Sequence, residues 1–268
     1  MKTSYTVLLL SVMLIGLKVV RPELTGILLL NSFGEPKNNI VRFWMEKFEY
    51  KILPEILTVN FKYLKLEGGD KMDLEILPAD STRTVCFLTP GSQTYEMVKD
   101  TLVIRSQRNL RDASYIKVYG NVESLDVVGG TEVLLGRVSQ NTLRIHVKDR
   151  SKLKTMSPLL GKKDKSVMEN ISIKAAGESN VELRTLAARN ISVDVNNSMV
   201  KYGFAVAADT MQVNLSGNSN VKAVDVSHKS GINTLIVSGN KTYFKPDSIG
   251  YGVRLVWGTD ETYVHIKQ

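Results

Sequence analysis

A five-residue pattern recurs along the second half of the chain and limits the possible folds more than any other feature. It consists of a small or turn-forming residue, three polar residues and, in most copies, an apolar residue. Gly177-Glu-Ser-Asn-Val181 and Gly217-Asn-Ser-Asn-Val221 are two clear copies. The copies begin at Gly129, Asp149, Gly177, Asn196 (degenerate), Gly217, Gly239 and Gly258 (loose). These starts are therefore 20, 28, 19, 21, 22 and 19 residues apart.

Alternating apolar and polar residues surround the copies, as in Val221-Lys-Ala-Val-Asp-Val226. Such alternation is typical of β-strands with one buried side. The 28-residue step contains Pro158 and a cluster of lysines, which predicts an extra loop. A period near 20 fits two architectures: hairpins of a meander or sandwich, and stacked coils of a solenoid. The return of the same residue types at the same phase favours stacked coils.

The pattern therefore predicts an all-β body, a parallel β-helix of about six to eight coils with Val, Ile and Leu pointing inward. Glycine suits turns that need positive φ. Asparagine also tolerates left-handed backbone geometry, and stacked asparagines can form side-chain amide ladders. The structural turn positions are expected at Gly129, Gly177, Asn180, Gly217, Asn220 and Gly239.

The chain before the first copy also contains short alternating stretches. Strands are expected at residues 61–66, 73–77, 84–88 and 101–104, with Gly, Pro, Asp and Ser between them. Residues 40–58 instead have apolar positions at helical spacing, which predicts a short amphipathic helix broken at Pro54.

The N-terminal residues resemble a targeting element. Lys2 precedes the uncharged run Tyr5–Leu17, which suits the apolar part of a signal peptide and is short for a membrane span. Continuing through Lys18 to Val20 gives a marginal span, because the lysine stem can snorkel. No A-x-A cleavage site and no lipoprotein cysteine follow the run, so an uncleaved anchor is favoured over a cleaved signal.

Composition and charge exclude some functions. A 43% hydrophobic content argues against wholesale disorder, and the +8 charge is spread along the chain, so no nucleic-acid partner is expected. The single cysteine, Cys86, cannot form an internal disulfide and is expected to be a buried core residue.

Residues suited to catalysis or metal binding are few. The three histidines, His146, His228 and His265, lie far apart, and no zinc, calcium or nucleotide motif is present, so no metal or cofactor is expected. The alternative to a binding protein is an enzyme, a polysaccharide lyase or hydrolase, since stacked carboxylates could supply the required pair. The candidates are Glu178 with Glu182, or Asp194, Asp209 and Asp225.

From about residue 58 onward, the chain resembles the head GIN domain family of auto-transporter adhesins, common in Bacteroidetes-type bacteria. The resemblance rests on the Phe61–Gly68 strand and turn, on Thr101-Leu-Val-Ile104 and on the repeated Ser-Asn-Val motifs. The Met-Lys-Thr-Ser start before an apolar run is similar to membrane-anchored relatives. The resemblance implies a right-handed parallel β-helix at the cell envelope with an adhesive role, and it supplies no catalytic residues.

Together these observations predict three segments: a membrane anchor or signal (1–21), a connecting segment (22–57) and a β-helix (58–268). The expected protein is a non-catalytic binding or scaffold module of the bacterial cell envelope. It is expected to face the periplasm, held to the inner membrane by residues 4–20. The alternative is a cleaved, secreted or outer-surface protein. The sequence does not identify a partner; glycans or other envelope proteins are the candidates, beside the membrane contacted by the N-terminal segment.

Overall fold

The computed structural model describes residues 55–79, 84–88, 93–106, 114–155, 168–224, 229–239, 252–258 and 264–266. This part of the chain contains 18 strands and no helix, so the predicted all-β body is confirmed. It accordingly holds no helix that could cross a membrane. The predicted N-terminal anchor and the predicted lysine-rich loop lie outside the described residues.

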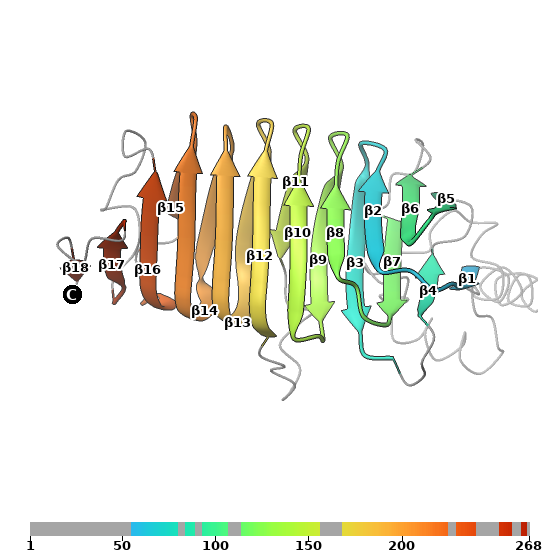
Figure 1. The fold of residues 1–268 in the computed structure, drawn as a ribbon, viewed down its shortest axis with the longest axis horizontal. Helices are drawn as coiled ribbons and strands as arrows, with labels where there is room; N and C mark the ends of the chain where they lie inside the picture. The colour runs from blue at the N-terminus through green and yellow to red at the C-terminus, as the bar shows by residue number, and fades with distance from the viewer. Residues whose placement is uncertain are drawn as a thin grey trace, which may run out of the picture. The chain divides into compact units, whose positions relative to one another are not determined.

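All the strands belong to one sheet, in which most stand side by side (Figure 1). They are β1 (Glu55–Thr58), β2 (Tyr63–Glu67), β3 (Lys71–Leu77), β4 (Val85–Leu88), β5 (Gln93–Val98), β6 (Thr101–Ser106), β7 (Ser114–Tyr119), β8 (Ser124–Val127), β9 (Glu132–Val138), β10 (Thr142–Val147), β11 (Lys152–Thr155), β12 (Met168–Ala176), β13 (Asn180–Asn196), β14 (Met199–Ser216), β15 (Asn220–Ala223), β16 (Gly231–Gly239), β17 (Arg254–Trp257) and β18 (Val264–Ile266).

Neighbouring strands in the middle of the sheet are parallel and lie about one pattern period apart in sequence. Ile171 of β12 pairs with Ile191 of β13, which pairs with Met211 of β14. The 28-residue step keeps the same register, because Leu143 of β10 pairs with Ile171. The two halves of β13 have different partners on one side, since its first residues pair with β11 and its later ones with β12. The sheet therefore curls as the chain advances.

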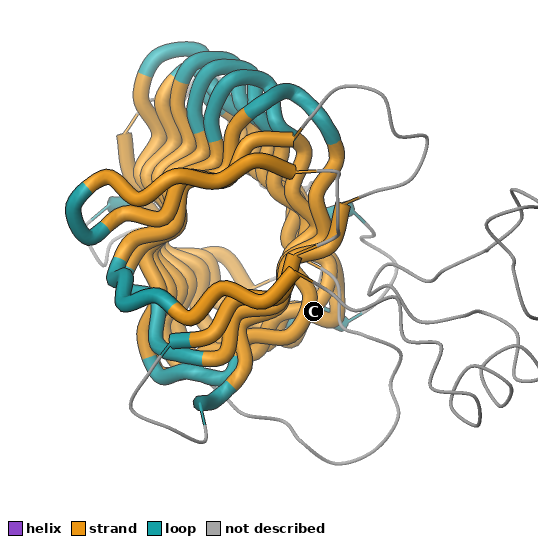
Figure 2. Tube along the Cα trace, turned by 90° about the vertical axis from the view of Figure 1, so that its right-hand side faces the viewer, coloured by secondary structure: helices purple, strands orange, loops and turns teal. Residues whose placement is uncertain are grey.

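The curled sheet encloses the hydrophobic core. Figure 2, a view along the stack, shows the strands arranged around a common centre. Alternation sends every second side chain inward, and in-register pairing then stacks like side chains: Ile173, Val193 and Val213 are neighbours in the sheet and have no exposed surface. Such side chains form one continuous hydrophobic cluster, which also includes Cys86. Burial raises the pKa of the Cys86 thiol to about 12.

Six of the seven pattern starts have a positive φ. Gly129 (68°), Gly177 (66°), Gly217 (61°) and Gly239 (96°) are among them, and so are Asp149 and Gly258. Their interpretation as equivalent turns of one repeat stays a prediction.

The two asparagines expected to share this turn geometry differ from the expectation. Asn180 and Asn220 begin β13 and β15 and do not have positive φ, whereas Asn197 has a φ of 47°. Each begins a strand because its backbone N–H donates to a residue at the start of the neighbouring strand, Asn180 to Ser151 O and Asn220 to Ser198 O. Extended geometry is required for that pairing.

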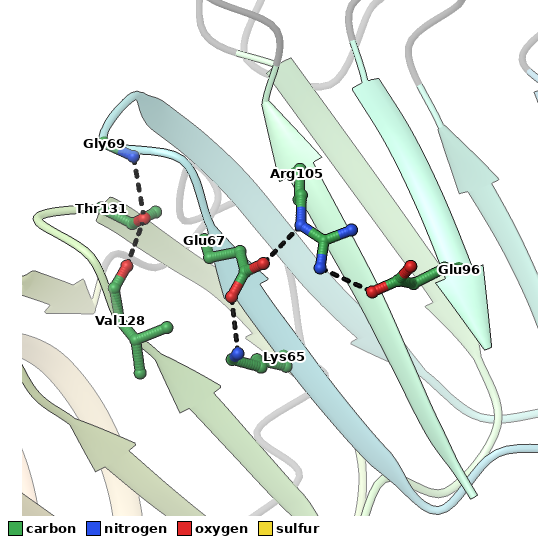
Figure 3. A network of polar contacts seen from close by, with 7 residues as sticks. All are labelled: Lys65, Glu67, Gly69, Glu96, Arg105, Val128 and Thr131. Carbon is green, nitrogen blue, oxygen red and sulfur yellow. Dashed lines mark hydrogen bonds and ion pairs between the residues drawn. The ribbon is translucent and has the colours of Figure 1, made fainter. Parts of the chain in front are cut away.

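Buried hydroxyl groups connect the stacked turns. Ser198 Oγ accepts a hydrogen bond from Ser179 N (3.1 Å) and donates to Asn196 O (2.9 Å). Thr131 Oγ1 accepts from Gly69 N (3.2 Å) in the same way (Figure 3). These hydroxyls satisfy backbone groups that a turn would otherwise leave unpaired. The hydroxyl column, as we call it, consists of Thr131, Ser151, Ser179, Ser198 and Ser219, each at most 6% exposed.

Antiparallel strands occur at both ends of the stack. β17 pairs antiparallel with β18, and at the other end β5 pairs with β6 while β4 pairs with β7 and β1. The helix predicted for residues 40–58 is therefore wrong at its end, because Glu55–Thr58 form β1. Ile56 and Leu57 pair there with Phe87 and Cys86, and this ladder outweighs their helical spacing.

Candidate functional site

Outward side chains of β8, β10, β12 and the later parts of β13 and β14 form three rows across the sheet. In-register outward side chains stand about 4.8 Å apart, the spacing of neighbouring strands. We call this surface the amide–hydroxyl face. It comprises Asn170, Asn190 and Thr210 in the first row, Ser124, Arg144, Ser172, Ser192 and Gln212 in the central row, and Asp126, His146, Lys174, Asp194 and Asn214 in the third row.

The first and third rows contain side-chain hydrogen bonds between neighbouring strands. Asn190 Nδ2 donates to Asn170 Oδ1 (3.0 Å), and Asn214 Nδ2 donates to Asp194 Oδ1 (2.7 Å). An amide has two donor hydrogens and an acceptor oxygen, so each asparagine keeps capacity for another partner. These bonds fix the side chains in position while leaving them able to bind a ligand.

The central row contains polar groups without such partners. The side chains of Arg144, Ser172, Ser192 and Gln212 form no hydrogen bond or ion pair with any other residue the structure describes. Arg144 and Gln212 are exposed, and the two serines are half-buried between the flanking rows. The row therefore presents donors and acceptors on successive strands, between two rows that are already held in place.

A second surface lies on β3, β9, β11, β15 and the first parts of β13 and β14. We call it the lysine face and define it by Lys71, Lys152, Lys154, Lys201 and Lys222.

Two glutamates on these strands are already paired. Lys154 Nζ lies 2.7 Å from Glu132 Oε1, and this hydrogen bond lowers the pKa of Glu132. Glu182 Oε1 accepts from Arg184 Nε at 2.8 Å. The structure therefore leaves an excess of positive charge on the lysine face.

The carboxylates considered for catalysis do not form the expected pairs. The register neighbours of Asp194 are Lys174 and Asn214, and those of Glu182 are Lys154 and Lys201. Glu178 forms an ion pair with Arg150 (2.9 Å), Asp209 accepts from Asn233 (3.4 Å), and Asp225 lies outside the described residues. None of the four described carboxylates is a register neighbour of another, so they do not stack on adjacent strands as the expected pairs would.

Of the three histidines, only His146 has a side chain that the structure describes. His146 Nδ1 lies 2.8 Å from Asp126 Oδ1 on the amide–hydroxyl face. His228 lies outside the described residues, and only the backbone of His265, in β18, is described. Within the described part of the chain, no three His, Cys, Asp or Glu side chains gather closely enough to hold a metal ion.

Sequence reasoning missed the central row, although its signal was present. Ile171-Ser-Ile173 and Ile191-Ser-Val193 place a serine between two apolar residues, 20 residues apart. Among the outward lysines, Lys174 lies on the amide–hydroxyl face, whereas Lys201 and Lys222 belong to the lysine face.

Comparisons with known proteins gave structural similarities at low sequence identity. No protein-family model matches the chain, and no curated protein matches it. A "putative adhesin" from Parabacteroides distasonis has a TM-score of 0.44 at 12% identity, over 78% of this chain and 94% of its own. One of the same name from Bacteroides fragilis has a TM-score of 0.46 at 11% identity, over 77% and 95%. A "putative lipid binding protein" from Parabacteroides distasonis has a TM-score of 0.35 at 13% identity, over 78% and 98%. Because each TM-score is below 0.5, these similarities carry no argument about function.

Proposed function

We propose that this chain is a non-catalytic, adhesin-like module of the bacterial cell envelope that binds glycans through the amide–hydroxyl face. The framework would be a right-handed parallel β-helix over residues 58–268, with turns at the predicted positions. In-register parallel pairing at one pattern period supports this architecture. The right hand is the usual one for connections between parallel strands of one sheet.

The observation that carries the proposal is the central row of the face. Ser172, Ser192 and Gln212 offer hydroxyl and amide groups one coil apart, and no described residue satisfies them. Sugar hydroxyls both donate and accept hydrogen bonds, as these side chains do. A linear glycan lying across the coils would meet such groups repeatedly, and the paired rows on either side would keep the surface preorganised.

A panel of neutral linear glycans tests the proposal. The variant Ser172→Ala/Ser192→Ala/Gln212→Ala should lose binding about tenfold or more, since it removes three hydrogen-bond partners worth about 0.5–1.5 kcal/mol each. The control Lys152→Ala/Asn220→Ala changes another surface and should bind as the unmodified protein does. Equal glycan binding by the unmodified protein and both variants would refute the proposal that the amide–hydroxyl face binds glycans. Glycan cleavage that depends on Asp194 or Glu182 would instead favour a polysaccharide-acting enzyme.

The proposed location is the periplasm, with residues 1–21 as an inner-membrane anchor and 22–57 as a connecting segment. The uncharged run after Lys2 supports it. Cell fractionation with N-terminal sequencing distinguishes the anchor from a cleaved signal. An intact N-terminus in the inner-membrane fraction is expected, and a shortened N-terminus in the medium or on the outer surface would overturn it.

A further inference from the structure

Two lysines stand side by side on the lysine face. Lys201 of β14 is in direct register with Lys222 of β15, and neither side chain forms an ion pair with a described residue. Lys222 is exposed and Lys201 half-buried. Adjacent in-register side chains lie about 4.8 Å apart. Like charges in that arrangement destabilise a sheet, so the stack carries an electrostatic cost at this point.

The same surface avoids that cost in the preceding coils. Glu132 stands between Lys71 and Lys152 in register and binds Lys154. In the N-terminal part of the lysine face no two lysines are therefore register neighbours. This separation ends at Lys201, whose register neighbours are Lys222 and Glu182, and Glu182 already accepts from Arg184.

We infer that the lysine face binds a linear acidic glycan, with its carboxylate or sulfate groups at Lys201 and Lys222. An anion between the two ammonium groups removes their repulsion, so binding and stability favour the same geometry. Lysine suits this role because its ammonium is a compact charge on a flexible stem. The inference rests on the proposed function as a glycan-binding module, but it uses a different surface and a different class of glycan.

Neighbouring groups favour an acidic glycan over a nucleic acid or a membrane. Asn220 lies two residues before Lys222 on the same side of β15, and Glu182 is the other register neighbour of Lys201, so acceptors for sugar hydroxyls lie beside the two cations. Neither register neighbour of Lys201 is aromatic, so base stacking has no platform there.

Polygalacturonate is the probe, and titration of the full-length protein is the measurement. Lys201→Gln/Lys222→Gln should weaken binding about tenfold, as loss of two strong exposed ion pairs would, and should flatten its salt dependence. Lys62→Gln/Lys148→Gln removes the same charge from exposed sites outside the lysine face and should bind normally. Polygalacturonate should also raise the melting temperature of the unmodified protein more than that of the Lys201/Lys222 variant.

Three results would overturn the inference. These are equal losses in both lysine variants, no binding of polygalacturonate, or tighter lysine-dependent binding of a single-stranded oligonucleotide or of phosphatidylglycerol vesicles. The neutral-glycan panel with the Ser172/Ser192/Gln212 variant is scored separately. Neutral binding without polygalacturonate binding would leave the proposed function standing and remove this inference. Polygalacturonate binding without neutral-glycan binding would refute glycan binding at the amide–hydroxyl face and would leave binding at the lysine face standing.

Discussion

Single buried hydroxyl groups connect successive turns through hydrogen bonds. Ser198 is 6% exposed, and its Oγ both accepts from Ser179 N and donates to Asn196 O. Ser219 repeats the arrangement one coil later, where its Oγ lies 3.5 Å from Ser198 N. A buried N–H without a partner costs more free energy than an average hydrogen bond contributes. Each hydroxyl therefore couples the stability of two successive turns.

Ser198→Ala should lower the free energy of unfolding by about 1–3 kcal/mol, because Ser179 N then has no acceptor. Ser192→Ala, a half-buried serine outside the hydroxyl column, is the matched control and should change stability by less than about 0.5 kcal/mol. Urea unfolding followed by circular dichroism measures both. Similar losses of unfolding free energy in the two variants would show that a serine of the hydroxyl column contributes no more to stability than a half-buried serine outside it.

The sequence predicts which side chains point inward, but not which hydroxyl groups are buried. The alternation around Val193 and Val213 fixes which side chains point inward, because one face of a strand must be buried. The third position of the pattern is Thr or Ser in Thr131, Ser151 and Ser179, yet their burial could not be predicted, since it depends on the turn of the next coil.

One arginine of β6 links the exposed strand β5 to β2, whereas β6 itself pairs with β2 and buries Leu102 and Ile104. Arg105 Nε lies 2.5 Å from Glu67 Oε1 of β2, and its Nη2 lies 2.5 Å from Glu96 Oε1 of β5 (Figure 3). Lys65 also binds Glu67, at 2.6 Å. Apart from Gln93, every residue of β5 is exposed, so this strand has little buried surface of its own. The ion pairs and the ladder with β6 therefore carry its stability.

Acid should loosen the β5–β6 hairpin before the rest of the stack. Hydrogen bonds from Lys65 and Arg105 lower the pKa of Glu67, and Arg105 also lowers that of Glu96. A carboxylate with a lowered folded-state pKa stabilises above its ordinary value of 4.5 and loses that contribution as pH falls below it. Amide exchange in β5 and β6, corrected for intrinsic rates, should speed up from pH 7 to pH 4.

Arg105→Gln is the control for this pH effect. It should already exchange faster at pH 7 and show little further change at pH 4, while amides of β13 remain protected in both proteins. If the hairpin of the variant responded to acid as strongly as the unmodified one, the ion pairs would not be its source.

The sequence predicts the positions of several strands but not their directions. The strands near residues 61–66, 73–77 and 101–104 could be predicted from alternation, and β2, β3 and β6 overlap them. The reversal of β4 and β5 could not, because the direction of a strand is set by its partners and not by its own pattern. The polar faces share this dependence, since they exist only when distant strands are in register.

If the proposed coil architecture holds, stability should depend on complete coils. Because Asn170, Asn190 and Thr210 are register neighbours, neighbouring strands in this region are 20 residues apart in sequence. Deleting residues 191–210 joins Asn190 to Met211 and leaves every remaining side chain facing its present side. Deleting 191–211 reverses the alternation after the junction and turns polar Gln212 toward the core.

The 20-residue deletion should therefore give a folded, shorter protein with one cooperative unfolding transition. The 21-residue deletion should aggregate or unfold at a much lower denaturant concentration. Circular dichroism and denaturant titration of both proteins provide the measurement. If the two deletions behaved alike, the coil architecture proposed for this chain would have to be abandoned.

The antiparallel strands at the two ends limit how the parallel sheet can be extended. A parallel stack has a direction, like a filament, and an open end could accept another copy. A reversed strand such as β18 or β5 has a different spacing of hydrogen-bonding groups from the parallel strands behind it. At β18 and β5, a further parallel strand therefore cannot simply be added. Under the proposed function, the number of sugar units that a face can contact is set by the number of strands that the chain forms.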